Sequence, residues 1–202
     1  MKHKLTAIAL ACALLLCAAC AGAPAPEPEQ STLAPNTPGT LTISFDYEKQ
    51  SGSASNQFAV WIAGMDGQLV KTLCATKFTA GGGYKNRPDS IATWVGKAMG
   101  VSDFDAVATA TPKASGPVAY VWNLTDEAGE AVPAGTYWFI VEGTLRWQNR
   151  VLYSGQIEIG GKNATAEAEP KFTFAGEGRQ PALDEDAPEA GMIANVKAQY
   201  IA

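Results

Sequence analysis

The chain contains few of the residues that catalytic and metal centres most often use. Its 202 residues include one histidine, His3, which lies in an N-terminal segment that we expect to be removed. A mature protein without histidine cannot build a Ser-His-Asp or Cys-His site, a histidine-ligated zinc site or a histidine proton shuttle. Serine–lysine and paired-carboxylate chemistry remain open, but no two carboxylates have the spacing of an acid–base pair. We therefore expect no catalytic residues, and a protein that is not an enzyme.

Cysteine is scarce in the same way. Cys12, Cys17 and Cys20 lie near the N-terminus, and Cys74 is the fourth. If Cys20 becomes a lipidated N-terminus, Cys74 stands alone and no intramolecular disulfide can form. Cys74 lies in a predicted strand and has no histidine base, so we interpret it as a small buried hydrophobe rather than a nucleophile.

Positive charge is also limited. Loss of Lys2 and Lys4 leaves 13 of the 15 basic residues against 20 acidic residues, a net charge of about −7. Such a surface disfavours nucleic acid and anionic headgroups. The acidic run at residues 184–186 could hold calcium, but acidic runs in loops with Pro and Gly are usually solvated. We expect neither a nucleic-acid partner nor a bound metal.

The first twenty residues have the layout of a bacterial export signal. Two lysines precede a stretch of small and apolar residues at 5–19, which is too short to span a bilayer. Small residues before Cys20 resemble the lipobox of bacterial lipoproteins, although Cys17 stands where Leu is usual. This resemblance implies that residues 1–19 are a signal peptide and that Cys20 carries a lipid.

The expected location follows from this signal. A lipid on Cys20 would hold the protein on the periplasmic side of a membrane. By resemblance to lipoprotein sorting rules, Ala21 in place of aspartate after Cys20 favours the outer over the inner membrane. Ordinary secretion, with cleavage after a small residue such as Ala23, is the alternative. Residues 20–39 are rich in Pro, Ala and polar residues, which predicts a flexible tether. Residues 40–202 have enough apolar content for one domain.

Alternation of apolar and polar residues dominates this domain. It predicts about seven or eight strands joined by short turns. The strand at 136–145 carries large residues on both faces and should therefore be central in its sheet. The expected fold is an all-β, immunoglobulin-like antiparallel β-sandwich. The expected strands are 41–47, 56–63, 68–74, 118–122, 136–145, 151–159, 171–174 and 192–200.

Residues 79–100 interrupt the β pattern. The glycine run at 81–83 has neither the lysine nor the spacing of a phosphate-binding loop, so we interpret it as a flexible linker. After it, Asp89 or Ser90 could cap one short helix near 90–98.

Two groups of side chains are candidates for a binding patch. Tyr84, Arg87 and Trp94 could form one, but a short helix that covers one open end of a sheet is the favoured interpretation. Arg146 and Trp147 could stack on a ligand, or make a cation–π contact at the surface.

Four segments carry a family resemblance, at residues 58–94, 104–116, 121–147 and 151–161. In this order they resemble the predicted periplasmic proteins catalogued as domain of unknown function 2271. The tract WNLTDEAGEAVPAGTYWFIVEG, within the third segment, is also similar to the immunoglobulin-like domain of flagellar hook-capping proteins. That local similarity implies an immunoglobulin-like fold and no flagellar role.

The family resemblance also implies a redox context. Its members resemble components encoded beside flavin transferases and membrane electron-transfer proteins. Residues 105–111 are similar to the Asp-x-x-Ser/Thr-Gly-Ala-Thr motif that accepts flavin mononucleotide (FMN), with Asp105 and Ala110 matching and Thr111 as the acceptor. Ala108 and Thr109 replace the Ser/Thr and the glycine of that motif, so a plain loop is the favoured interpretation.

The sequence therefore favours a lipid-anchored periplasmic protein that binds an envelope protein partner or acts as a scaffold, without catalysis or a cofactor. The alternative is an accessory, or a covalently flavinylated component, of an extracytoplasmic flavin-linked electron-transfer system. A hydrolase that uses serine and lysine or carboxylates has no positive support.

Overall fold

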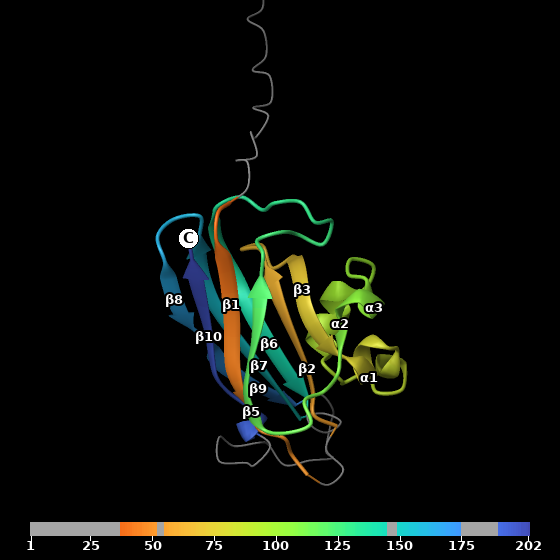
Figure 1. Cartoon of the computed structure of the whole chain (residues 1–202). Coiled ribbons are helices and arrows are strands. Elements are labelled where there is room, and N and C mark those ends of the chain that lie inside the picture. The colour runs from red at the N-terminus through yellow and green to blue at the C-terminus, as the bar shows by residue number, and fades with distance from the viewer. Residues whose placement is uncertain (1–36, 52–54, 145–148, 175–189) are drawn as a thin grey trace, which may run out of the picture. The chain divides into compact units, whose positions relative to one another are not determined.

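Two β-sheets packed face to face form the domain in a computed structural model of the chain, which describes residues 37–51, 55–144, 149–174 and 190–202 (Figure 1). The four-stranded sheet has the order β5-β1-β10-β8, and the six-stranded sheet has the order β4-β3-β2-β6-β7-β9. The strands are β1 (Thr40–Tyr47), β2 (Gln57–Ala63), β3 (Leu69–Thr76), β4 (Ala108–Thr109), β5 (Gly116–Trp122), β6 (Gly135–Thr144), β7 (Asn149–Ile159), β8 (Ala164–Glu167), β9 (Glu169–Phe174) and β10 (Ile193–Ile201).

The predicted all-β sandwich with a short helix is confirmed. Neighbouring strands pair antiparallel, except that β3 and the two-residue β4 pair in parallel. The described part of the chain has more strands than expected, because β4 was not predicted and the 163–174 region forms two strands. The helices are α1 (Lys77–Ala80), η1 (Gly83–Lys85), α2 (Ala92–Ala98), α3 (Phe104–Val107) and η2 (Ala190–Met192).

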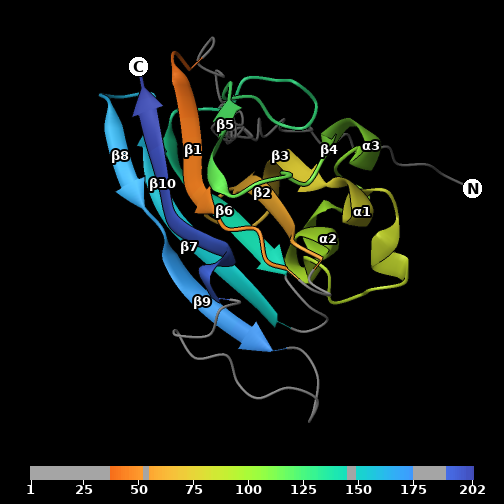
Figure 2. The ribbon, with the colours of Figure 1, turned by 60° about the horizontal axis from the view of Figure 1, so that its bottom comes forward.

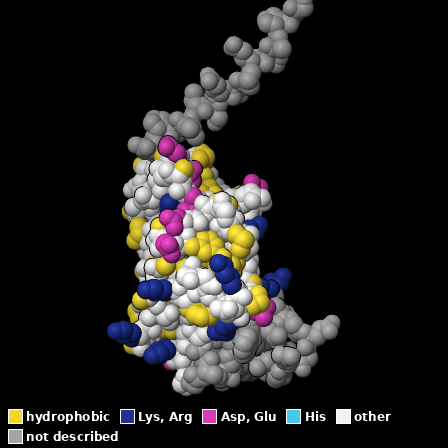
Figure 3. Space-filling model, turned by 90° about the vertical axis from the view of Figure 1, so that its right-hand side faces the viewer, with side chains coloured by type: hydrophobic (Ala, Val, Ile, Leu, Met, Phe, Trp, Pro, Cys, Tyr) yellow, Lys and Arg dark blue, Asp and Glu magenta, His cyan; other side chains and the backbone are white. Residues whose placement is uncertain are grey.

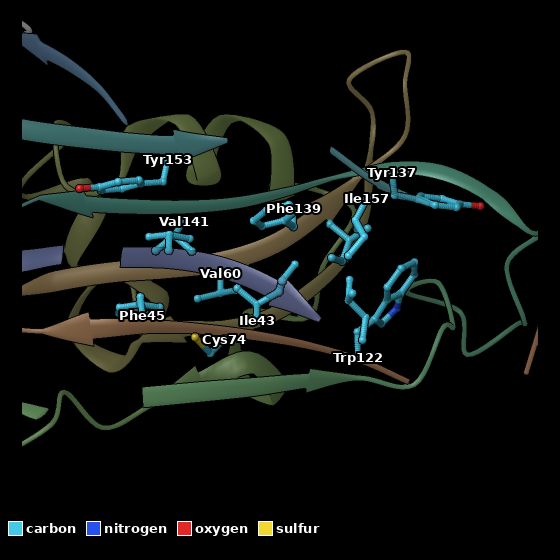
Figure 4. Packing of buried hydrophobic residues seen from close by; sticks show 14 of the residues in the cluster. Ile43, Phe45, Val60, Cys74, Trp122, Tyr137, Phe139, Val141, Tyr153 and Ile157 are labelled. Atoms are coloured by element: carbon cyan, nitrogen blue, oxygen red, sulfur yellow. The ribbon is translucent and has the colours of Figure 1, made fainter. Parts of the chain in front are cut away.

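The core lies between the sheets because each strand turns one apolar face inward (Figure 4). At one end of this core, the Trp122 ring packs edge-on against Tyr137, with ring centroids 5.4 Å apart, and its indole N–H donates to the Thr125 carbonyl at 2.7 Å. The labelled residues of the cluster are Ile43, Phe45, Val60, Cys74, Trp122, Tyr137, Phe139, Val141, Tyr153 and Ile157.

Strand β6 is central, as its two apolar faces predicted. It pairs with β2 on one side and β7 on the other. Tyr137, Phe139 and Val141 point into the core between the sheets. Trp138 and Ile140 pack on the opposite face, in a second cluster that includes residues of α2.

The helices cover a face of the six-stranded sheet, so the interpretation that a helix closes one open end is wrong. Trp61 of β2 and Trp94 of α2 belong to the same buried cluster on the outer face of this sheet. Figure 2 shows α1 and α2 beside β2 and β3, away from β1 and β10. The hydrophobic side chains on this face of β2 require a cover, and the 77–107 segment provides it.

The glycine run at 81–83 is not a linker. Gly81 ends α1, Gly82 has a φ of +96°, and Gly83 begins η1. A Cβ on Gly83 would collide with the carbonyl oxygen and the ring of Phe78. Glycine is therefore required here for a left-handed turn and for a close approach of the Phe78 ring to the backbone.

The chain changes sheets between β8 and β9. Strand β8 pairs with β10, whereas β9 pairs with β7 in the other sheet. The Ala168 N–H, between β8 and β9, donates to the Val196 carbonyl at 2.9 Å. The weak alternation at 163–169 thus forms an edge strand of its own.

Candidate functional site

The buried end of β6 holds the helical segment in place. Glu142 is fully buried, and its carboxylate accepts the backbone N–H groups of Thr93 at 3.1 Å and Trp94 at 2.8 Å. These N–H groups lie in the first turn of α2, where no helix carbonyl can accept them. The expected cap from Asp89 or Ser90 is wrong, because the residue before α2 is Ile91 and no local side chain caps the helix.

The environment of Glu142 is that of a structural carboxyl group. Burial raises the pKa of Glu142 above its usual value, while the N–H groups of Trp94 and Thr93 oppose this shift. The Arg150 guanidinium lies 3.8 Å from the carboxylate and also favours its charged form. The oxygens are therefore used by α2 and Arg150 rather than presented to solvent.

A second contact from β6 fixes the turn that enters α2. Ile91 has a φ of +43°, a left-handed conformation that costs a β-branched residue on the order of 1–3 kcal/mol. Its N–H donates to the Thr144 hydroxyl at 2.9 Å. Beside it, the buried hydroxyls of Ser90 and Thr79 hydrogen-bond at 2.7 Å. The strained backbone is thus held by side chains from the sheet and from α1.

A second polar cluster ties the loop after β5 to the connection between α2 and α3. The Glu127 carboxylate accepts the Thr72 N–H at 2.8 Å and the Ser102 hydroxyl, and lies 3.9 Å from the Lys71 ammonium. The Trp94 indole N–H donates to the Thr72 hydroxyl at 3.2 Å. Hydrogen bonds therefore fix both ends of α2, at Ile91–Trp94 and at Ser102 in the connection that follows it.

This fixed segment exposes hydrophobic side chains. Phe78 is 44% exposed, Met99 is 56% exposed and Val101 is 52% exposed. Met99 borders a hollow of about 460 Å³, and Val101 borders a second one of about 460 Å³. We call the surface made by Phe78, Tyr84, residues 99–104 and the two hollows the helical face.

Charges surround the helical face unevenly. Figure 3 shows hydrophobic side chains in the middle, with Lys and Arg mostly below them and Asp and Glu mostly above. Lys85 lines the first hollow, whereas Asp126 and Glu127 line the second. Asp103 also lines the first hollow, but its carboxylate accepts two N–H groups at the start of α3.

The structure separates the residues of the expected binding patch. Tyr84 and Arg87 are half-buried on the helical face, where the Tyr84 ring lies 5.8 Å from the ring of Phe104. The Arg87 guanidinium lies 5.8 Å from the Phe78 ring. Trp94 has 0% exposure, so its ring belongs to the core and cannot touch a partner.

Several expected features lie outside the described residues. They are Cys20 and the signal peptide, most of the 20–39 tether, Arg146 with Trp147, and the acidic run at 184–186.

The 105–112 segment is not a plain loop. Asp105 lies in α3, and the following residues form β4 beside β3. The Thr109 hydroxyl donates to the Ala75 carbonyl at 3.4 Å. Ala110 is exposed and Thr111 is half-buried in the irregular stretch before β5. Along the chain, Asp105 therefore precedes the short strand β4 and Thr111 follows it.

Cys74 is buried between the sheets, as expected for a small hydrophobe. Burial raises the pKa of its thiol to about 12, although hydrogen bonds with Tyr120 and Thr109 act in the opposite direction. The thiol is therefore protonated at neutral pH and shielded from reagents.

Comparison with known proteins adds a family. The family model described as predicted periplasmic protein (DUF2271) matches residues 39–175. The chain belongs to this family. No curated protein and no solved structure matches the chain. The DUF2271 match covers the six-stranded sheet, the whole helical segment and every strand of the four-stranded sheet except β10, so the helical face is part of the family's domain.

Two further findings on this DUF2271 domain concern metal ligands and membrane-spanning helices. Within residues 37–51, 55–144, 149–174 and 190–202, no group of three or more His, Cys, Asp or Glu side chains could hold a metal ion. Among the helices of the same ranges, none is long and apolar enough to cross a membrane.

Sequence reasoning missed the two structural carboxylates. Glu142 had a signal, because it is the one charged residue of β6 and directly follows five large apolar residues that occupy both faces. A buried charge in such a place needs hydrogen-bond partners. Glu127 had no such signal in the sequence, because it lies in a turn, where acidic residues are common.

Replacement of Glu142 with Ala should destabilise the protein by about 3 kcal/mol, because it leaves two N–H groups of α2 without their acceptor and removes an ion-pair contact of Arg150. Urea unfolding measures this loss, and hydrogen exchange should locate it in α2. The control is Glu158→Ala, an exposed glutamate on β7, which should change stability by less than about 0.5 kcal/mol. Equal effects of the two substitutions would contradict the capping role.

Proposed function

We propose that this DUF2271 protein is a non-catalytic binding or scaffold module of the cell envelope, held on the periplasmic side by a lipid on Cys20. One observation carries the proposal: exposed Phe78, Met99 and Val101 lie on the helical segment, which hydrogen bonds from β6 and from the loop after β5 hold in place. A grouped apolar surface is costly to leave in water, and a rigid one loses little entropy when it binds.

The use of the buried polar groups supports a role without catalysis. Glu142 caps a helix, Glu127 joins two loops, and Cys74 is protonated and enclosed. A general base or nucleophile would need a perturbed group that faces a cavity. Glu142 and Cys74 face the interior of the fold. Glu127 borders the second hollow, but its carboxylate is taken up by Thr72, Ser102 and Lys71.

The helical face should be the surface that binds envelope proteins. Tagged full-length protein, crosslinked in intact cells and purified, should retain a set of partners that the Met99→Asp variant loses, because a buried carboxylate opposes an apolar contact. The control is Val121→Asp, which places the same charge at a 63% exposed valine on β5. If both variants retain the same partners, the helical face is not the binding surface.

Lipidation of Cys20 is tested separately. The full-length protein should incorporate radiolabelled palmitate, and the Cys20→Ser variant should lose the label because the acceptor sulfur is gone. Cys74→Ser should keep it, since that thiol is buried in the domain. Absence of label in the parent protein would favour ordinary secretion.

The flavin-linked function is the second candidate, and half-exposed Thr111 is the residue that would accept FMN. Because α3 and β4 occupy the segment and the motif has lost its glycine, we expect no attachment. Mass spectrometry after co-expression with a flavin transferase should give an unshifted Thr111 peptide. A peptide heavier by one FMN group, and unshifted in Thr111→Ala, would replace the scaffold proposal with the flavin function.

A further inference from the structure

The helical face combines a projection with two hollows. The connection from Met99 to Asp103 forms a ridge, with Met99 and Val101 exposed and Gly100 at a φ of +79° between them. Met99 and Gly100 border one hollow, and Val101 borders the other. The ridge is therefore the common wall of two hollows of similar volume.

Both hollows offer apolar contacts, and the first is the more polar of the two. It is lined by Tyr84 and Phe104 together with Gly81 and Gly82, and Lys85, Ser102 and Asp103 add polar groups. The second is lined mainly by Leu69, Val70, Val132, Pro133 and Tyr137. Each hollow is large enough for a methionine or valine side chain, which are the types that the ridge presents.

The two ends of the ridge carry mainly opposite charges, although Asp103 lies at the lysine end and Lys71 contacts Glu127 at the carboxylate end. Lys85 lies at the first hollow and is exposed, and Lys77 on α1 is exposed nearby. Asp126 lies at the second hollow, and Glu130 of the same loop is exposed. A half-turn about an axis through the ridge would bring the lysine end of one copy to the carboxylate end of another.

We propose that the helical face binds a second copy of this chain about a two-fold axis near Gly100. The inference rests on the proposed function, in which this face is the docking surface. The Gly100 backbones of the two copies then meet at the axis, and Met99 of each copy enters the hollow beside Val101 of the other. Two lysine–carboxylate contacts form at the ends. A surface that carries both partners of each contact is self-complementary, which is what a two-fold interface requires.

Crosslinking of full-length protein in intact cells tests this geometry. Val101→Cys lies close to the axis, so a short bismaleimide should join two copies and give a band of twice the monomer mass. Val121→Cys is the matched control, because Val121 is an equally apolar and exposed side chain on the four-stranded sheet. The parent chain measures any crosslinking through Cys20, while Cys74 is buried.

Dimer from Val101→Cys at several times the yield from Val121→Cys supports the proposal. Equal yields from the two variants overturn it. A Val101→Cys product of another mass, with no dimer, also overturns the second copy as occupant but leaves the helical face as a docking surface. No product from Val101→Cys, together with partner retention by Met99→Asp, would remove the proposed function as well.

Charge reversal tests the orientation. In the Val101→Cys background, Lys85→Glu or Glu130→Lys alone places like charges together twice per dimer and should lower the dimer yield about two- to five-fold. The two reversals together exchange the charges of the two ends, so that opposite charges meet again and the dimer yield should be restored. Failure of the double variant to recover, when each single reversal lowers the yield, overturns the two-fold arrangement.

Discussion

The placement of the 77–107 segment depends on the buried carboxylate of Glu142. This carboxylate lies at the buried end of the central strand and accepts the free N–H groups of a helix 48 residues earlier in the chain. A buried carboxylate needs hydrogen-bond donors, and the first turn of a helix has N–H groups that lack acceptors. Glu142 and α2 therefore satisfy each other's hydrogen-bonding groups. The position of α2 over the six-stranded sheet follows from this exchange.

Helix α2 could not exist without the sheet. It has seven residues, fewer than an isolated helix needs, and it begins after Ile91 in a left-handed conformation. Trp94 packs on the outer face of the sheet, and Glu142 and Thr144 supply the missing acceptors. The side chains that this helix and its neighbours do not bury, chiefly Met99 and Val101, then remain on the outside.

Short-range patterns in the sequence predicted the sandwich well, because strand alternation and turn chemistry are local. The two apolar faces of residues 136–145 even predicted that β6 is central. Contacts between distant residues were not predictable in this way. A cap supplied by Glu142, a glycine required by the nearby Phe78 ring, and a change of sheet at Ala168 each depend on residues brought together only by the fold. On the helical face, the sequence offered Tyr84 and Arg87 as binding candidates together with Trp94, which is buried, and it did not point to the exposed Met99 and Val101.

A paired arrangement of helical faces must also be compatible with attachment to one membrane. The start of the described domain is tied down where Thr37 donates to the Val132 carbonyl at 2.6 Å and Tyr200 donates to the Pro38 carbonyl at 2.6 Å. In Figure 1 this end lies near the loop after β5, and the helices lie to the side.

A two-fold axis across the helical face therefore sends the N-termini of the two copies in opposite directions. The 17 residues of the expected tether that precede this fixed start can span at most about 56 Å, while the 11 residues of β7 extend about 36 Å. If residues 20–36 form the extended tether that the sequence predicts, both copies can reach the same membrane, and the pairing sets a minimum length for that segment.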